Sequence, residues 1–208
     1  MNLKLKICGM KDPDNTRLVA LLKPDYLGFI FYHGSPRNFT GFIDLSNNVI
    51  PAEIGRVGVF VNEQPETVLK KVEVYNLDMI QLHGNETPEY CFHFRDKAIP
   101  LIKAIRINGA EDFNDLEKFE NTCDYFLFDT GSGGFGGTGK KFNWDLLEYY
   151  RGRLPFFLSG GIGPEDSKII RKLDINGLFA IDINSRFEVS PGIKDIQLLE
   201  TFMQSINS

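Results

Sequence analysis

The stretch Phe-Phe-Leu-Ser-Gly-Gly-Ile-Gly-Pro, residues 156–164, contains one complete step from a β-strand to a helix. Residues 156–159 form a short, mainly apolar run of the kind found in buried strands. The glycines that follow allow a tight turn, and Pro164 has the fixed backbone angle that suits the first position of a helix. We therefore predict a strand at 156–159 and a helix at 164–173, which together form one βα unit.

Seven further segments repeat this pattern along the chain. Short runs typical of strands occur at 3–8, 26–31, 56–61, 79–83, 101–107, 125–129 and 178–183, each followed by room for a helix. Eight βα units in 208 residues favour a closed (β/α)₈ TIM barrel over an open doubly wound sheet, which usually has fewer strands at this length. No linker or change of composition divides the chain, so we expect one domain spanning residues 1–208.

Helix signals occupy several of the gaps between these strands. Asp12 followed by Pro13 predicts an N-cap and a first helical position. Apolar residues recur at helical spacing over 64–75 and 194–206. Residues 40–51 carry only weak helical signals, so we expect the second unit to be irregular.

Composition and charge narrow the classes of function. The net charge is −5 and no basic run is present, which argues against a nucleic-acid partner. The N-terminal residues alternate apolar side chains with lysines instead of forming a signal peptide, and no apolar stretch is long enough to cross a membrane. Cys8, Cys91 and Cys123 have neither zinc-site nor disulfide spacing, which is typical of a reducing, cytoplasmic location.

A glycine-rich loop at residues 131–139, Gly-Ser-Gly-Gly-Phe-Gly-Gly-Thr-Gly, matches parts of two nucleotide-binding motifs. The dinucleotide motif also needs an acidic residue at the end of the next strand, which here ends in Ser159. The phosphate-loop motif needs a hydroxyl side chain after its lysine, where this chain has Lys141. We therefore interpret the segment as a lid over the barrel mouth, without a nucleotide cofactor.

Two loops at the ends of the last two strands predict a phosphate site. Barrel enzymes commonly bind phosphate with the loops that follow strands seven and eight. Gly160 and Gly161 follow the seventh strand, and their lack of side chains lets backbone amides approach phosphate oxygens beside the next helix. Asp182, Asn184 and Ser185 end and follow the eighth strand, and are candidates for the other half of the site.

Further residues at the predicted mouth have side chains that suit catalysis or ligand binding. Cys8 ends the first strand, where a thiolate can act if the site favours it. Asp129 ends the sixth strand in apolar surroundings that suit a general acid, but Asp182 ends the eighth strand in the same way, so neither acid is singled out. Arg37, after the second strand, has a guanidinium shaped for a carboxylate. His83 either orients a ligand or satisfies its own loop, and no histidine cluster predicts a metal site.

Together these residues resemble the phosphoribosylanthranilate isomerases, barrel enzymes of tryptophan biosynthesis. The shared segments run in the right order along nearly the whole chain. They are Lys6-Ile7-Cys8-Gly9-Met10, Ser35-Pro36-Arg37, Gln81-Leu82-His83-Gly84, Phe128-Asp129, Gly136-Gly137-Thr138-Gly139, Leu158-Ser159-Gly160-Gly161-Ile162, Asp182-Ile183-Asn184-Ser185 and Ser190-Pro191-Gly192-Ile193-Lys194-Asp195. The chain departs from the family at Ser185-Arg186-Phe187-Glu188, where the family often reads Ser-Gly-Val-Glu, so Arg186 either adds a cation near phosphate or points outward.

The resemblance implies an Amadori rearrangement of a phosphorylated sugar, N-(5-phosphoribosyl)anthranilate, with neither metal nor organic cofactor. It implies that Asp129 is the general acid and Cys8 the general base. It also implies that Arg37 binds the anthranilate carboxylate, while the loops after strands seven and eight bind phosphate. We expect the enzyme to act as a monomer or a homodimer.

Two alternatives are less consistent with these residues. The histidine-pathway isomerase resembles a two-fold repeat whose first strand ends in aspartate, whereas here that strand ends in Cys8 and the two halves lack matching phosphate loops. A non-catalytic sensor of sugar phosphates would not need both Cys8 and Asp129, and a turnover assay separates it from an enzyme.

Overall fold

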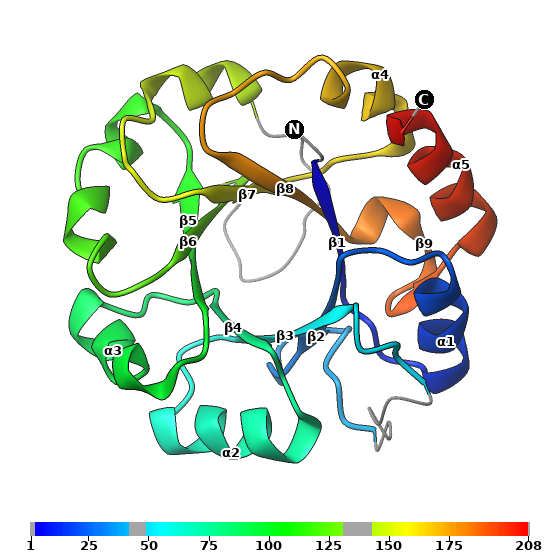
Figure 1. Ribbon diagram of the computed structural model, residues 1–208, viewed down its shortest axis with the longest axis horizontal. Helices are drawn as coiled ribbons and strands as arrows, with labels where there is room; N and C mark the ends of the chain where they lie inside the picture. Colours follow the sequence, from blue (N-terminus) through cyan, green and yellow to red (C-terminus); the bar gives the residue numbers. More distant parts are fainter. Residues whose placement is uncertain (1–2, 42–48, 131–142, 208) are drawn as a thin grey trace.

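The structure is a computed structural model that describes residues 3–41, 49–130 and 143–207. Eight parallel strands pair in chain order, and the first pairs with the eighth to close a barrel (Figure 1). The strands are β1 (Lys4–Cys8), β2 (Tyr26–Ile30), β3 (Gly55–Phe60), β4 (Met79–Leu82), β5 (Leu101–Ile107), β6 (Tyr125–Thr130), β7 (Phe156–Leu158) and β8 (Leu178–Ile183). Each matches one predicted segment, with ends that differ by no more than one residue. The predicted (β/α)₈ barrel is confirmed.

Helices and helical turns surround the barrel (Figure 1). The α-helices in the described residues are α1 (Pro13–Leu21), α2 (Pro65–Tyr75), α3 (Pro88–Phe92), α4 (Ser167–Ile170) and α5 (Ile196–Asn207). The 3₁₀ turns are η1 (Arg95–Lys97), η2 (Ala110–Phe113), η3 (Leu116–Phe119), η4 (Trp144–Tyr149), η5 (Pro164–Asp166) and η6 (Ser185–Phe187). A small hairpin, β9 (Glu188–Ser190) and β10 (Ile193–Lys194), lies between η6 and α5.

The predicted start of the first helix is confirmed. Asp12 is the N-cap of α1, and its carboxylate accepts a hydrogen bond of 2.8 Å from the backbone N–H of Asn15. Such a cap satisfies one of the N–H groups that have no partner within the helix. The predicted helix over 64–75 is also present, with Gln64 at the N-cap position of α2.

Two predicted helices differ from the structure. The segment 164–173 is the turn η5 followed by only one turn of α-helix, because Asp166, Lys172 and Leu173 donate to carbonyls three residues back. The C-terminal helix begins at Ile196 and not at 194, because Lys194 pairs with Glu188 in the β9–β10 hairpin.

Apolar side chains fill both sides of the strands. One cluster lies between the barrel and the outer helices, and a second, smaller cluster closes the barrel interior. The second contains Phe157 from β7, whose ring packs edge-on against Tyr26, Tyr125 and Phe179. Strand side chains alternate between the two faces, so most strands contribute to both clusters. The exception is β1, which contributes Leu5 and Ile7 to the outer cluster and carries Lys6 and Cys8 on its other face.

Two segments with structural predictions lie wholly or partly outside the described residues. The glycine-rich segment 131–139 is one of them, so its predicted closure as a lid stays a prediction. Of residues 40–51, the structure describes 40–41 and 49–51, where Ile50 is fully buried. None of the helices described is both long enough and apolar enough to cross a membrane.

Candidate active site

A pocket opens at the carboxyl ends of the barrel strands, the face at which barrel enzymes bind their substrates. The residues predicted for catalysis and ligand binding all line it, although they come from six different strand ends or loops. They are Cys8, Arg37, His83, Asp129, Gly160, Gly161, Asp182, Asn184 and Ser185. The pocket is also lined by apolar side chains, including Ile30, Val59 and Ile162. It therefore combines apolar walls with a few converging polar groups, as ligand sites do.

Cys8 is a buried thiol at the end of β1, with the ammonium of Lys6 on the same side of the strand. Both groups lie close to Gly28 on β2, where an added Cβ would sit 2.8 Å from the Cys8 Sγ and 3.2 Å from the Lys6 Nζ. Burial raises the pKa of Cys8, and the charge of Lys6 acts in the opposite direction. Lys6 is thus the nearby cation that a thiolate at this position needs.

Asp182 differs sharply from the other strand-end carboxylate. Its Oδ1 accepts a 2.9 Å hydrogen bond from the Lys6 Nζ, and both side chains are buried. Burial raises the pKa of Asp182 and Lys6 opposes this rise, while Asp182 and Cys8 together keep the pKa of Lys6 raised against its own burial. Asp182 therefore borders the pocket mainly as the partner of Lys6.

Asp129 is the more accessible acid and has a polar neighbour. Its Oδ2 lies 3.4 Å from the Nε2 of His83, and both side chains are partly exposed in the pocket. The surroundings of Asp129 are thus less apolar than the sequence predicted. The Nδ1 of His83 is 2.9 Å from the amide nitrogen of Gln81. Because that nitrogen only donates, the ring proton is placed on Nε2, facing Asp129. His83 is thus held by Gln81 and faces the carboxylate of Asp129.

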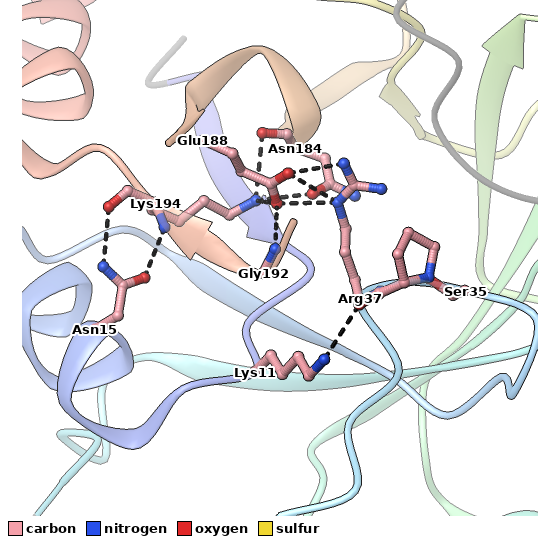
Figure 2. Close-up of polar contacts among 9 residues, drawn as sticks. Lys11, Asn15, Ser35, Arg37, Asn184, Glu188, Gly192 and Lys194 are labelled. Atoms are coloured by element: carbon pink, nitrogen blue, oxygen red, sulfur yellow. Dashed lines mark hydrogen bonds and ion pairs between the residues drawn. The ribbon is translucent and has the colours of Figure 1, made fainter. Parts of the chain in front are cut away.

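Arg37, which the sequence predicted to bind a carboxylate from the loop after β2, is buried and lines the pocket. Its Nε and Nη2 donate to the carboxylate of Glu188 on β9, with the shortest distance 2.7 Å (Figure 2). Glu188 also accepts a 2.7 Å hydrogen bond from the Nζ of Lys194 on β10. The hairpin after β8 thus contacts the loop after β2, and it brings the carboxylate of Glu188 and the ammonium of Lys194 together behind Arg37, which lines the pocket.

The loop after β7 has the backbone geometry expected of an anion site. Gly160 and Gly161 have φ values of 92° and 69°, a region that side-chain-bearing residues rarely adopt. Within the described residues, their N–H groups donate to no other backbone or side-chain group, so they are available to a ligand. By contrast, the N–H of Gly163 is already bound to the Oδ2 of Asp166 at 2.9 Å. The sequence predicted that the N-terminus of the next helix would help to bind phosphate. That contribution is small, because the element that follows the loop is the three-residue turn η5.

The loop after β8 supplies backbone more than side chains. The Asn184 side chain accepts a 2.7 Å hydrogen bond from the Lys194 Nζ, so its oxygen faces that lysine. Ser185 is the first residue of the turn η6 and lines the pocket. Arg186 also borders the pocket, but its Nη2 is paired at 2.7 Å with Glu165, and both side chains are exposed. This ion pair joins the loops after β7 and β8.

Sequence reasoning missed four residues around this pocket: Lys6, Gln81, Glu188 and Lys194. Lys6 and Gln81 precede Cys8 and His83 by two positions on their strands, so the two-residue period of a strand was the available signal. Glu188 and Lys194 lie in segments quoted for the family resemblance, but nothing local indicates that their side chains meet. Cys91 and Cys123 are buried away from the pocket, as expected for structural cysteines.

The sequence of this chain is similar to those of one known protein family. The sequence profile described as N-(5'phosphoribosyl)anthranilate (PRA) isomerase matches residues 5–205. A protein of that name from Parabacteroides distasonis is 44% identical over 205 residues, which cover 97% of this chain and 92% of the relative.

The chain also has the fold of solved structures from that family. The phosphoribosyl anthranilate isomerase of Thermus thermophilus has a TM-score of 0.85 at 27% identity, covering 99% of this chain and 98% of that one. A second isomerase structure, in complex with reduced 1-(o-carboxyphenylamino)-1-deoxyribulose 5-phosphate, has a TM-score of 0.79 at 28% identity with the same coverage.

Proposed function

Because this chain belongs to the N-(5'-phosphoribosyl)anthranilate isomerase family of tryptophan biosynthesis, we propose that Cys8 and Asp129 carry out the family's rearrangement here. The substrate is N-(5-phosphoribosyl)anthranilate, and the product is 1-(2-carboxyphenylamino)-1-deoxyribulose 5-phosphate. The observation that carries this assignment is that a buried thiol beside a lysine and an accessible carboxylate oriented by His83 line the same pocket.

Asp129 is the general acid in this proposal. It donates a proton to the ring oxygen of the ribose as the bond between that oxygen and C1 breaks, and the anilino nitrogen supplies the electron pair that forms an iminium. His83 then stabilises the resulting carboxylate of Asp129, because its Nε2 faces the Oδ2 at 3.4 Å. Asp182 is less suited to this role, because its carboxylate is already bound to Lys6.

Cys8 is the general base. Its thiolate removes the proton from C2, which the adjacent iminium makes acidic, and the electron pair moves to form an enolamine. The enolamine then tautomerises to the ketone product. The iminium serves as the electron sink, so the proposed reaction uses no cofactor. Lys6 supports the base by stabilising the thiolate, since its charge lowers the pKa of Cys8 against the effect of burial.

The two anionic ends of the substrate are recognised by different chemistry. Arg37 binds the anthranilate carboxylate through the part of its guanidinium that faces the pocket. The N–H groups of Gly160 and Gly161, together with the backbone at Ser185, bind the phosphate. All of these residues belong to one barrel, so we infer that residues 1–208 act as a single domain.

The direct test is a fluorescence assay that follows consumption of freshly prepared N-(5-phosphoribosyl)anthranilate. We expect turnover by the purified chain without added metal or nucleotide. Absence of turnover by correctly folded protein would contradict the proposal. Retention of near wild-type turnover by both Cys8→Ser and Asp129→Asn would instead contradict the assignment of the acid and the base.

A further inference from the structure

The carboxylate of Glu188 is saturated with hydrogen-bond donors. Its Oε1 accepts from the Arg37 Nε at 2.9 Å, the Lys194 Nζ at 2.7 Å and the Gly192 N–H at 3.2 Å. Its Oε2 accepts from the Arg37 Nη2 at 2.7 Å (Figure 2). Burial disfavours the charged form, but these donors outweigh it and the pKa of Glu188 is lowered. A carboxylate held in this way stays charged and is not available as an acid or base.

Lys194 is fixed from the other side by α1. Its backbone N–H donates to the Oδ1 of Asn15 at 2.8 Å, and its carbonyl accepts from the Nδ2 of Asn15 at 2.9 Å. Its Nζ donates to the Oδ1 of Asn184 as well as to Glu188. The side chain of Lys194 is entirely buried. Glu188 therefore rests on a fixed cation and does not depend on Arg37 to hold its own position.

The position of Arg37 follows from these contacts. Glu188 occupies the edge of the guanidinium formed by Nε and Nη2, and the pocket is left with the edge that carries Nη1. Gly9 lets the arginine lie close to the backbone, since a Cβ there would meet the Arg37 Cδ at 2.8 Å and the Asn184 Oδ1 at 2.6 Å. Glu188 thus holds the guanidinium before any ligand arrives, and the absence of a side chain at Gly9 leaves room for the arginine stem.

The cluster of Arg37, Glu188 and Lys194 carries a net positive charge that suits an anionic ligand. Arg37 and Lys194 are two cations, whereas Glu188 is one anion, so the cluster that holds the pocket-lining Arg37 carries one net positive charge. Burial lowers the pKa of Lys194, and the charge of Glu188 opposes this and favours the protonated ammonium. A single ligand carboxylate would neutralise the net charge of the cluster. A pair consisting of Arg37 and Glu188 alone would be neutral and would attract an anion only weakly.

We propose that Glu188 and Lys194 are positioning residues for the recognition of an aromatic carboxylate by Arg37. Glu188 fixes the guanidinium so that its free edge faces the pocket, and Lys194 restores the positive charge that Glu188 removes. This inference rests on the proposed function, in which Arg37 binds the anthranilate carboxylate. A side chain ordered in advance loses less conformational entropy when the ligand binds.

The test compares two ligands on Glu188→Gln, Arg37→Ala and the double variant. One ligand is 1-(2-carboxyphenylamino)-1-deoxyribulose 5-phosphate, which carries the carboxylate, and the other is D-ribose 5-phosphate, which does not. A glutamine has one acceptor and one donor end, whereas both oxygens of Glu188 face donors. Glu188→Gln therefore turns an N–H group towards another donor and releases Arg37 without changing the volume of the side chain.

We expect calorimetry to show that Glu188→Gln weakens binding of the carboxylated ligand by about tenfold, because the lost charge-assisted hydrogen bond from a correctly placed Arg37 outweighs the net positive charge that the substitution adds. Binding of ribose 5-phosphate should change less than about twofold by the same reasoning. In the Arg37→Ala background, Glu188→Gln should add no further loss, because it acts through the arginine. A matched control is Glu120→Gln, which removes another nearly buried glutamate bound to an arginine, Arg153, outside the pocket. It should leave both affinities unchanged.

Several outcomes would overturn the inference. Equal weakening of both ligands by Glu188→Gln would mean that the hairpin only supports the site as a whole. A full additional loss in the double variant would mean that Glu188 acts independently of Arg37. If Arg37→Ala itself failed to weaken the carboxylated ligand selectively, the proposed function of Arg37 would be wrong instead. Thermal unfolding of each variant establishes that it is folded, and Lys194→Met, which removes the balancing cation, should show the same selective loss as Glu188→Gln.

Discussion

Replacing Lys6 by methionine tests whether a buried lysine makes Cys8 a usable base. The Lys6 Nζ and the Cys8 Sγ lie within 3.2 Å and 2.8 Å of the same point above Gly28, so they are at most 6.0 Å apart. Methionine keeps most of the volume of lysine and removes its charge. The remaining carboxylate of Asp182 is buried, which favours its protonated form once Lys6 is gone. The substitution therefore removes one cation and adds no lasting anion beside the thiol.

The size of the effect follows from the separation. At 6 Å and an effective dielectric constant of about 20, unit charges interact by roughly 3 kcal/mol. This corresponds to a loss of roughly 100-fold in the thiolate population at a pH below the pKa of Cys8. Burial has already raised that pKa above its usual value, so kcat/KM of the native enzyme should increase with pH. In Lys6→Met it should be about 100-fold lower at neutral pH and should increase only at still higher pH.

The assay is kcat/KM for phosphoribosylanthranilate against pH, with folding checked by circular dichroism. Lys103→Met is the matched control, because Lys103 is another buried lysine, paired with Glu86 at 2.9 Å. It should also destabilise the fold and can lower the rate, but its pH profile should keep the native shape. A folded Lys6→Met enzyme with native kcat/KM and a native pH profile would refute the role of Lys6.

Further predictions follow from the site and the core. Cys8→Ser and Asp129→Asn should each lower kcat by about 10²–10⁴-fold, as expected for general acid–base groups, while product binding measured by calorimetry changes little. Gly160→Val should weaken ribose 5-phosphate binding by about tenfold, because a β-branched residue is strained at φ 92° and displaces the amide; unchanged affinity would exclude that amide as a phosphate ligand. Exhaustive chelation should leave turnover intact, and metal-dependent recovery would contradict the cofactor-free proposal. Phe157→Ala should lower the free energy of unfolding, measured with urea, by about 3–5 kcal/mol, because Phe157 is fully buried in the barrel interior.

Much of the fold could be predicted because its signals are local. The run at 101–107 has the length and composition of a strand, and β5 has those same bounds. Asp12 and Pro13 mark a helix start through contacts made within four residues. The predicted helix at 164–173 is only partly present, as the turn η5 and the single turn α4. The local pattern favours a helix, but at both ends of the segment the N–H groups donate to carbonyls three residues back instead of four.

The candidate site also combines features that the sequence could predict with features that it could not. Cys8 and Asp129 could be placed at one face from the sequence, because parallel strands of a barrel all end on the same side. The sequence could not distinguish Asp129 from Asp182, since both end strands. The structure distinguishes them through their partners: Lys6, distant by 176 residues in the chain, neutralises Asp182, while His83 faces Asp129.

The sequence by itself therefore determined the barrel, its strand order and the set of residues at its mouth, because strand periodicity, caps and turns depend on neighbouring residues. Only the tertiary structure decided which charges meet. Glu188 is separated from Arg37 by 151 residues, and no local pattern encodes their contact. A buried ion pair forms only when closure of the barrel brings both partners out of water at once, because each charge alone would be too costly to bury.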